Sequence, residues 1–176
     1  MKTLTEQLAG YAAYHRDRRN IATHLVGVPV IVFAVVVLLS RPTLGTFGGA
    51  PVTPALLAAL AAGLYYAVLD LGLGTLMSVV LAAMLPAAAP LAAGTVGVWL
   101  GWGVGLFVAG WIVQFVGHAW EGRKPAFLDD VAGLLIGPLF VAAELAFLLG
   151  LRGALRAEIE ARVGPTRSGR PGSAAA

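Results

Sequence analysis

The sequence predicts an all-α fold, a polytopic membrane helix bundle of four to five apolar segments with a short amphipathic helix at its N-terminus. Of its 176 residues, 59% are hydrophobic and only 12% are charged, about half the charged fraction of a typical soluble domain. Between Arg41 and Glu121 the only charged residue is Asp70. A soluble fold of this size could not cover its surface with so few polar side chains.

The predicted helices follow five apolar segments, each near the roughly 20 residues that a membrane-spanning helix needs. They cover residues 24–39, 54–70, 72–93, 95–117 and 131–150. Proline- and glycine-rich stretches separate them. Gly137 and Pro138 lie near the middle of the last segment and leave two interpretations open, a full span or a re-entrant hairpin buried in protein.

The two ends of the chain differ from these apolar segments. Residues 3–15 have apolar side chains at helical spacing and a threonine at the start, Thr3 or Thr5, which predicts a short capped amphipathic helix. We expect residues 1–151 to form a single transmembrane helical domain. Residues 152–176 are basic and are expected to form a partly disordered tail.

Charge and cysteine content exclude several classes of function. The chain has no cysteine, which excludes disulfides, thiolate metal sites and cysteine nucleophiles. The net charge of +3 comes from the two ends, so it indicates orientation in a membrane rather than nucleic-acid binding.

Arginines before the first segment place the N-terminus in the cytoplasm, and four crossings return the chain to the same side at His118. A multi-pass protein of the bacterial inner membrane is expected, with its histidines at the cytoplasmic face. The sequence specifies no oligomeric state.

Two of the three histidines lie in one polar patch before the first apolar segment. His15, Asn20 and His24 are separated by five and four residues. On one continuous helix, His15 and His24 would point in opposite directions, because each residue advances the helix by about 100°. The two rings can therefore converge only if the chain bends between them, with Asn20 as the expected N-cap of the first spanning helix.

The third histidine lies in a second polar patch at the end of the fourth segment. Gln114, His118 and Glu121 are spaced four and three apart, which places them on one stripe of a helix. Two or three histidines with a carboxylate suit a non-haem Fe(II) centre. Side chains that hydrogen-bond to the ligands would orient them, and Asn20, Gln114 and Asp130 are candidates. Asp130 is equally suited to capping the next segment.

Alternatives to the metal hypothesis stay open at this point. The histidines could simply lie at a membrane interface, in a protein without enzymatic activity such as a scaffold or a small transporter. A b-type haem protein could use His24 and His118 as axial ligands. Glu144 lies inside an apolar segment, where a charge needs a partner, and we expect that partner to be Arg123.

Two motifs make the chain similar to a known family. "YHRDRRNIATHLVGVP" has the form Y-H-x4-N-x3-H-x2-G-x-P. "WIVQFVGHAWEGRKPAFLDD" has the form W-x2-Q-F-x-G-H-x2-E-x-R-x-P-A-x2-D and is followed by "GPLFVAAELAF". With the hydropathy pattern between them, these motifs resemble the membrane-bound 2-hydroxy fatty acid dioxygenase family.

The resemblance implies an Fe(II)-dependent enzyme of fatty acid α-oxidation. Its substrates would be a 2-hydroxy fatty acid and dioxygen, and its product a fatty acid shorter by one carbon. The family's iron ligands match His15, His24 and His118. Its acidic residue after the third histidine matches Glu121, as a ligand or as a supporting residue. Arg123 matches its basic position, where a guanidinium could pair with the substrate carboxylate.

Overall fold

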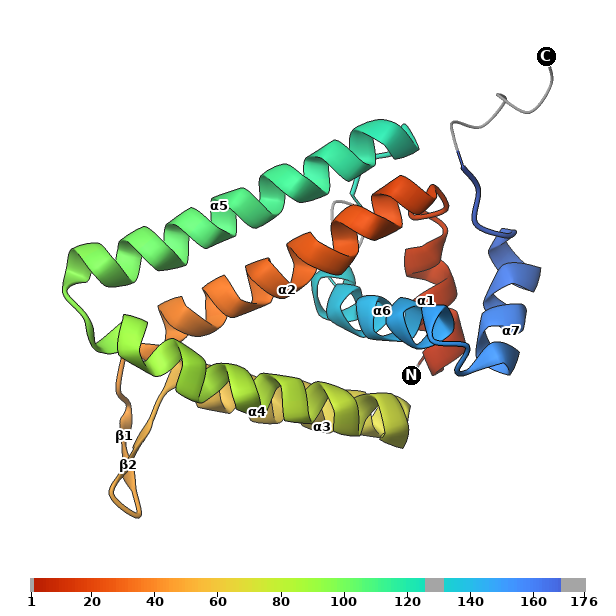
Figure 1. Cartoon of the computed structure of the whole chain (residues 1–176). Helices are drawn as coiled ribbons and strands as arrows, with labels where there is room; N and C mark the ends of the chain where they lie inside the picture. The colour runs from red at the N-terminus through yellow and green to blue at the C-terminus, as the bar shows by residue number, and fades with distance from the viewer. Residues whose placement is uncertain (1, 126–131, 169–176) are drawn as a thin grey trace. The chain divides into compact units, whose positions relative to one another are not determined.

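The structure, a computed structural model, describes residues 2–125 and 132–168 and is almost entirely helical. This confirms the predicted all-α class. In chain order the described elements are α1 (Leu4–Ala12), α2 (Arg18–Ser40), β1 (Gly45–Phe47), β2 (Ala50–Val52), α3 (Pro54–Leu69), α4 (Leu71–Ala93), α5 (Val96–Glu121), α6 (Gly133–Leu148) and α7 (Gly153–Val163) (Figure 1).

The chain divides into two compact units. Met1–Val28 and Trp111–Ala176 form one, called here the terminal unit, and Pro29–Gly110 form the other, the central unit. Helices α2 and α5 each begin in one unit and end in the other. All three histidines belong to the terminal unit.

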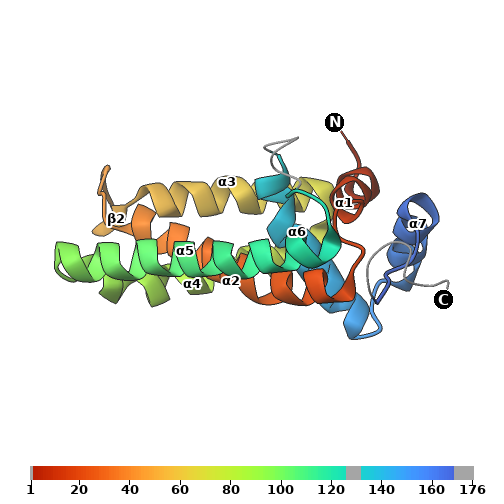
Figure 2. The same ribbon diagram turned by 90° about the horizontal axis from the view of Figure 1, so that it is seen from above.

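A tight helical hairpin dominates the central unit. The antiparallel β1–β2 hairpin precedes it, and α3 and α4 then lie side by side (Figures 1 and 2). Asp70 ends α3 and caps α4, because its Oδ1 accepts a hydrogen bond from the Leu73 N–H at 2.8 Å. A Cβ at Gly74 would overlap the backbone of Ala67, so the two helices pack backbone to backbone, as small residues allow in apolar bundles.

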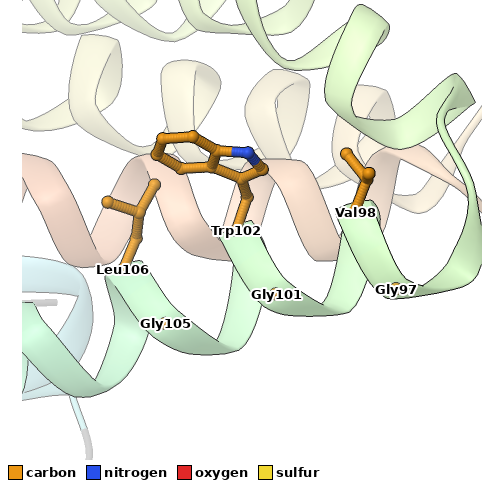
Figure 3. Close-up of a pocket in the computed structure, with 6 residues that line it drawn as sticks. All are labelled: Gly97, Val98, Gly101, Trp102, Gly105 and Leu106. Atoms are coloured by element: carbon orange, nitrogen blue, oxygen red, sulfur yellow. The ribbon is translucent and has the colours of Figure 1, made fainter.

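The first half of α5 carries a ridge of glycines. Gly97, Gly101 and Gly105 line a shallow cavity of about 400 Å³ together with three apolar side chains of the same helix, Val98, Trp102 and Leu106 (Figure 3). A Cβ at Gly101 or Gly105 would meet no described atom within 4 Å. These two glycines therefore face open space within this unit and make no close helix contact there.

Among the described helices, three are long and apolar enough to cross a membrane, namely α2, α4 and α5. Helices α6 and α7 would count as a fourth span if taken together, although they are bent by 116°. Helix α6 runs through Gly137 and Pro138 without a break, so a hairpin does not turn at these residues and the sharp bend follows Leu148 instead. The composition and these helices indicate a membrane protein.

In the terminal unit, α1 packs against both α6 and α7 (Figure 1). A capping box between Thr3 and Glu6 begins α1, and the helix ends at Ala12, three residues before His15. The segment expected as a tail contains α7 and a short extended stretch to residue 168. This stretch reaches the histidine region, as described below.

Candidate metal centre

His15 lies in the first residues after α1. Its backbone N–H still donates to the Ala12 carbonyl at 3.0 Å, in the manner of a final helical turn. Its Nδ1 contacts the Tyr11 carbonyl oxygen at 2.7 Å. The imidazole is fully buried and stacks on the Tyr11 ring, with centroids 4.2 Å apart and planes 5° from parallel. The position and orientation of this ring are therefore both defined by α1.

The chain bends between His15 and α2, as convergence of the two histidines requires. The cap of α2 is Asp17, and not Asn20 as the sequence analysis expects. The Arg19 N–H donates to Asp17 Oδ1 at 2.9 Å, and the Ile21 N–H donates to the Asp17 carbonyl at 3.0 Å. The Arg19 guanidinium also binds this carboxylate, which lowers the pKa of Asp17. Because aspartate caps helices as well as asparagine does, α2 begins earlier and Asn20 lies in its first turn.

His24 follows Asn20 by one helical turn. Its Nδ1 contacts the Asn20 carbonyl oxygen at 2.8 Å, and its ring is 2% exposed. Its Nε2 lies 3.0 Å from the Nε2 of His15. The bend thus brings together two rings that one continuous helix would hold apart.

His118, in the last turns of α5, completes the cluster. Its ring centroid lies 5.0 Å from that of His15 and 5.1 Å from that of His24. One nitrogen from each of the three buried rings lies within 4.8 Å of the others. The Nδ1 of His118 is buried and has no hydrogen-bond partner among the described residues. The three histidines of the chain therefore converge from three separate segments.

The hydrogen bonds of His15 and His24 determine which nitrogen carries a proton. A carbonyl oxygen only accepts, so each Nδ1 must be the N–H donor and each Nε2 must present a lone pair. Two lone pairs facing each other at 3.0 Å repel unless a cation lies between or beside them. Burial, and the neighbouring His24, hold the pKa of His15 well below its usual value, which disfavours a shared proton. Imidazoles oriented by carbonyl groups are the usual arrangement around a bound metal ion, so these residues fit one.

Glu121, one turn beyond His118, is 1% exposed and accepts four hydrogen bonds. Its Oε2 accepts from the Arg16 N–H, the Asp17 N–H and Asn20 Nδ2, at 2.9, 2.7 and 3.1 Å. Its Oε1 accepts from Arg167 Nη2 at 2.7 Å. The carboxylate thus connects α5 to the turn that joins His15 to His24.

The other predicted site residues have different surroundings. Gln114 is 4% exposed and its Oε1 has no hydrogen-bond partner among the described residues. Arg123 is exposed, and its Nη1 donates to the Ala13 carbonyl at 2.9 Å. Asp130 lies outside the described residues. Glu144, expected to pair with Arg123, instead lies 3.9 Å from Arg16 Nη2.

Helices α2 and α5 approach closely at Gly117, beside His118. A Cβ at this position would overlap Thr23 Oγ1 and press against Asn20 Oδ1. The absence of a side chain at Gly117 therefore permits the helix contact that places His118 near His24.

We expect Gly117→Ala to lower the free energy of unfolding by about 1–3 kcal/mol, because the added methyl group must push the helices apart. The measurement is unfolding in mixed detergent micelles followed by circular dichroism. Gly101→Ala is the matched control on the same helix, where a Cβ meets open space and alanine should be neutral or stabilising by up to about 1 kcal/mol. Equal stability of the two variants would contradict the close approach.

Two further residues adjoin the cluster. Phe140 of α6 lies 5.6 Å from His15 between ring centroids and also contacts Tyr11. Tyr11 precedes His15 by four residues on the predicted N-terminal helix, so its spacing could have identified it. Phe140 and Arg167 come from distant parts of the chain, and no local pattern marks either one.

Comparison with known proteins agrees with the two motifs. A family model described as 2-hydroxy-palmitic acid dioxygenase Mpo1-like matches residues 1–149. A protein of Saccharomyces cerevisiae named 2-hydroxy-palmitic acid dioxygenase MPO1 is 35% identical over 159 residues, which cover 89% of this chain and 87% of the yeast protein. No solved structure matches the chain. The three histidines, Asn20 and Glu121 all fall within the matched range. The chain therefore belongs to the 2-hydroxy-palmitic acid dioxygenase Mpo1-like family.

Proposed function

We propose that this protein is an Fe(II)-dependent dioxygenase that cleaves the C1–C2 bond of 2-hydroxy fatty acids. The observation that carries the proposal is the cluster of three buried histidines, in which His15 and His24 present unprotonated nitrogens to each other. The name of the yeast relative supplies the substrate class. The atoms balance when one 2-hydroxy fatty acid and one dioxygen give a fatty acid one carbon shorter, carbon dioxide and water.

His15, His24 and His118 would hold the iron. Bound Fe(II) supplies the Lewis acidity and the redox chemistry that reaction with dioxygen needs. Three ligands from the protein leave open positions for substrate and dioxygen, as in non-haem iron oxygenases. The carbonyl groups of Tyr11 and Asn20 orient two of the rings and hold the protons on their Nδ1 atoms.

Glu121 acts in this proposal as a positioning residue and not as a ligand. Both of its oxygens already accept hydrogen bonds, and no carboxylate oxygen joins the three histidine nitrogens in the described cluster. Its task is to hold the turn at Arg16 and Asp17 against α5. Asn20 supports the same contact from α2 through its hydrogen bond to Glu121, and the buried Gln114 on α5 is a further candidate for orienting a ligand.

Substrate binding would combine an apolar and a charged component. The acyl chain would lie among the apolar helices, where its burial is favourable at about 0.8 kcal/mol per CH₂. Arg123, which is exposed, is the candidate for pairing with the substrate carboxylate, because a guanidinium binds a carboxylate through two parallel hydrogen bonds. Burial of the three rings excludes bulk water from the reacting atoms.

Membrane orientation is part of the proposal. Arg16 lies just before α2, the first candidate span, and Arg18 and Arg19 lie in its first turn. Cytoplasmic segments carry an excess of positive charge. The cluster would then lie at the cytoplasmic face of a bacterial inner membrane and meet its substrate in the bilayer.

One experiment tests the reaction directly. Protein purified without oxygen and loaded with Fe(II) is given 2-hydroxypalmitate and dioxygen, and the products are followed by mass spectrometry. We expect pentadecanoate, with no turnover of palmitate, which lacks the 2-hydroxyl group. Turnover that persists after complete removal of iron, or the absence of any product from iron-loaded protein, would contradict the proposal.

The haem alternative is less compatible with the geometry. Axial coordination by His24 and His118 requires a porphyrin between the two rings. His15 Nε2 lies only 3.0 Å from His24 Nε2, so the His15 ring takes up space that the porphyrin would need. A visible haem spectrum in the purified protein would favour that alternative. A protein without enzymatic activity would bind neither haem nor iron.

A further inference from the structure

The segment Gly164–Arg167, called here the C-terminal strap, lies beside the turn that carries His15. It follows α7 and lies beyond residues 1–149, the range matched by the family model. Nothing in the two family motifs points to it.

The strap pairs with this turn through backbone hydrogen bonds. The Arg167 N–H donates to the Arg16 carbonyl at 2.8 Å, and the Arg18 N–H donates to the Arg167 carbonyl at 2.9 Å. Asp17 and Arg167 thus form a parallel bridge. At the other end of the strap, Arg16 Nη1 donates to the Gly164 carbonyl at 2.9 Å. These contacts constrain the backbone that connects His15 to α2.

The side chain of Arg167 extends the contact to α5. Its Nη2 donates to Glu121 Oε1 at 2.7 Å, in an ion pair whose carboxylate is fully buried while the arginine side chain is 35% exposed. Arg167 therefore contacts the turn between His15 and His24 with its backbone, and the helix of His118 with its guanidinium. Removing one partner of a buried ion pair is strongly destabilising, so this contact ties the C-terminal strap firmly to α5.

We propose that Arg167 is a positioning residue of the metal centre, and that the C-terminal strap holds the His15 turn in register with His118. The proposal depends on the proposed metal site. Its reason is geometric, because binding an ion requires the three nitrogens to stay within a few tenths of an ångström of one arrangement. The two connections of Arg167 restrict the relative movement of the segments that carry the nitrogens. Loss of such supporting contacts typically weakens metal binding by about 10–100-fold.

The test measures Co(II) binding to the full-length protein in detergent, with and without substitution of Arg167. The visible absorption of bound Co(II) reports both affinity and ligand geometry without any turnover. We expect Arg167→Ala to weaken Co(II) binding by about 10–100-fold and to alter the absorption band. Arg167→Lys, which retains the charge but donates from a single ammonium group, should restore part of the affinity. The matched control is Arg162→Ala on α7, whose partner is the exposed Glu158, and it should bind Co(II) as the wild type does.

The outcomes separate the strap from the metal site. Arg167→Ala protein that binds Co(II) with wild-type affinity and spectrum would overturn the role of the strap and leave the proposed function intact. Wild-type protein that binds no Co(II) would overturn both. A purely structural role predicts a lower melting temperature with an unchanged absorption band for each bound ion, and no advantage of lysine over alanine. Circular dichroism confirms that each variant is folded.

Discussion

The His24→Ala and His118→Ala proteins are expected to remain folded, and their affinity for the metal ion should fall by about 100-fold or more. Each ligand contributes on the order of 3–4 kcal/mol to the free energy of metal binding, because a full ligand set together contributes about 10–16 kcal/mol. Both rings are buried within the terminal unit, so their replacement also leaves small cavities, which cost some stability without affecting the helices. Anaerobic purification followed by elemental analysis measures the iron content of each variant.

The matched control for the histidine variants is Phe115→Ala. Phe115 lies one turn before His118 on α5 and is 52% exposed, so its removal should change neither iron content nor turnover. Iron content equal to wild type in both histidine variants would contradict the metal centre. If only His15 proved dispensable, the site would reduce to two ligands.

Glu121→Ala should produce the largest loss of stability of any substitution in the terminal unit, about 3–5 kcal/mol. The substitution removes the common acceptor of the Arg16 N–H, the Asp17 N–H, Asn20 Nδ2 and Arg167 Nη2, and the two buried backbone N–H groups lose the partner that they have. Glu121→Gln should cost less, about 1–3 kcal/mol, because the amide oxygen can still accept while its NH₂ group opposes Arg167. Thermal unfolding in detergent measures both.

The same two variants separate the possible roles of Glu121. As a positioning residue, Glu121→Gln should bind Co(II) more weakly and alter the absorption band in the same way as Arg167→Ala. As a ligand, it would change the band in a way that Arg167→Ala does not. Glu158→Ala is the control, since this exposed glutamate should change the unfolding free energy by less than about 0.5 kcal/mol. A Glu121→Ala protein as stable as this control would contradict the hydrogen-bond network.

The sequence predicts the helices well because the apolar segments are long and their breaks are marked by proline and glycine. Asp70 illustrates this agreement, since the lone charge among the apolar segments caps a helix. The start of α2 is predicted less well. Asp17 and Asn20 are both good caps, and the choice of Asp17 depends on its contacts with Arg19 and with the C-terminal strap.

Convergence of the histidines is predictable only in part. Counting four membrane crossings predicts that they lie at one face, and this stays a prediction because only three of the described helices up to His118 are individually long and apolar enough to span. The need for a bend between His15 and His24 follows from helix geometry alone. The role of Glu121 is not readable from its spacing, because three of its four donors lie about 100 residues earlier in the chain. The fourth, Arg167, lies in a segment whose composition suggests a solvated tail.

The C-terminal strap also sets an order of events during synthesis. Arg16 and Gly164 are separated by 148 residues, and the ribosome releases Arg167 only after every described helix has been made. Closing so long a loop is a late step in folding, because its entropic cost must be met before the contact forms. The strap therefore holds the turn of His15 only after Arg167 has been made, and a nascent chain with all three histidines already synthesised still lacks this contact.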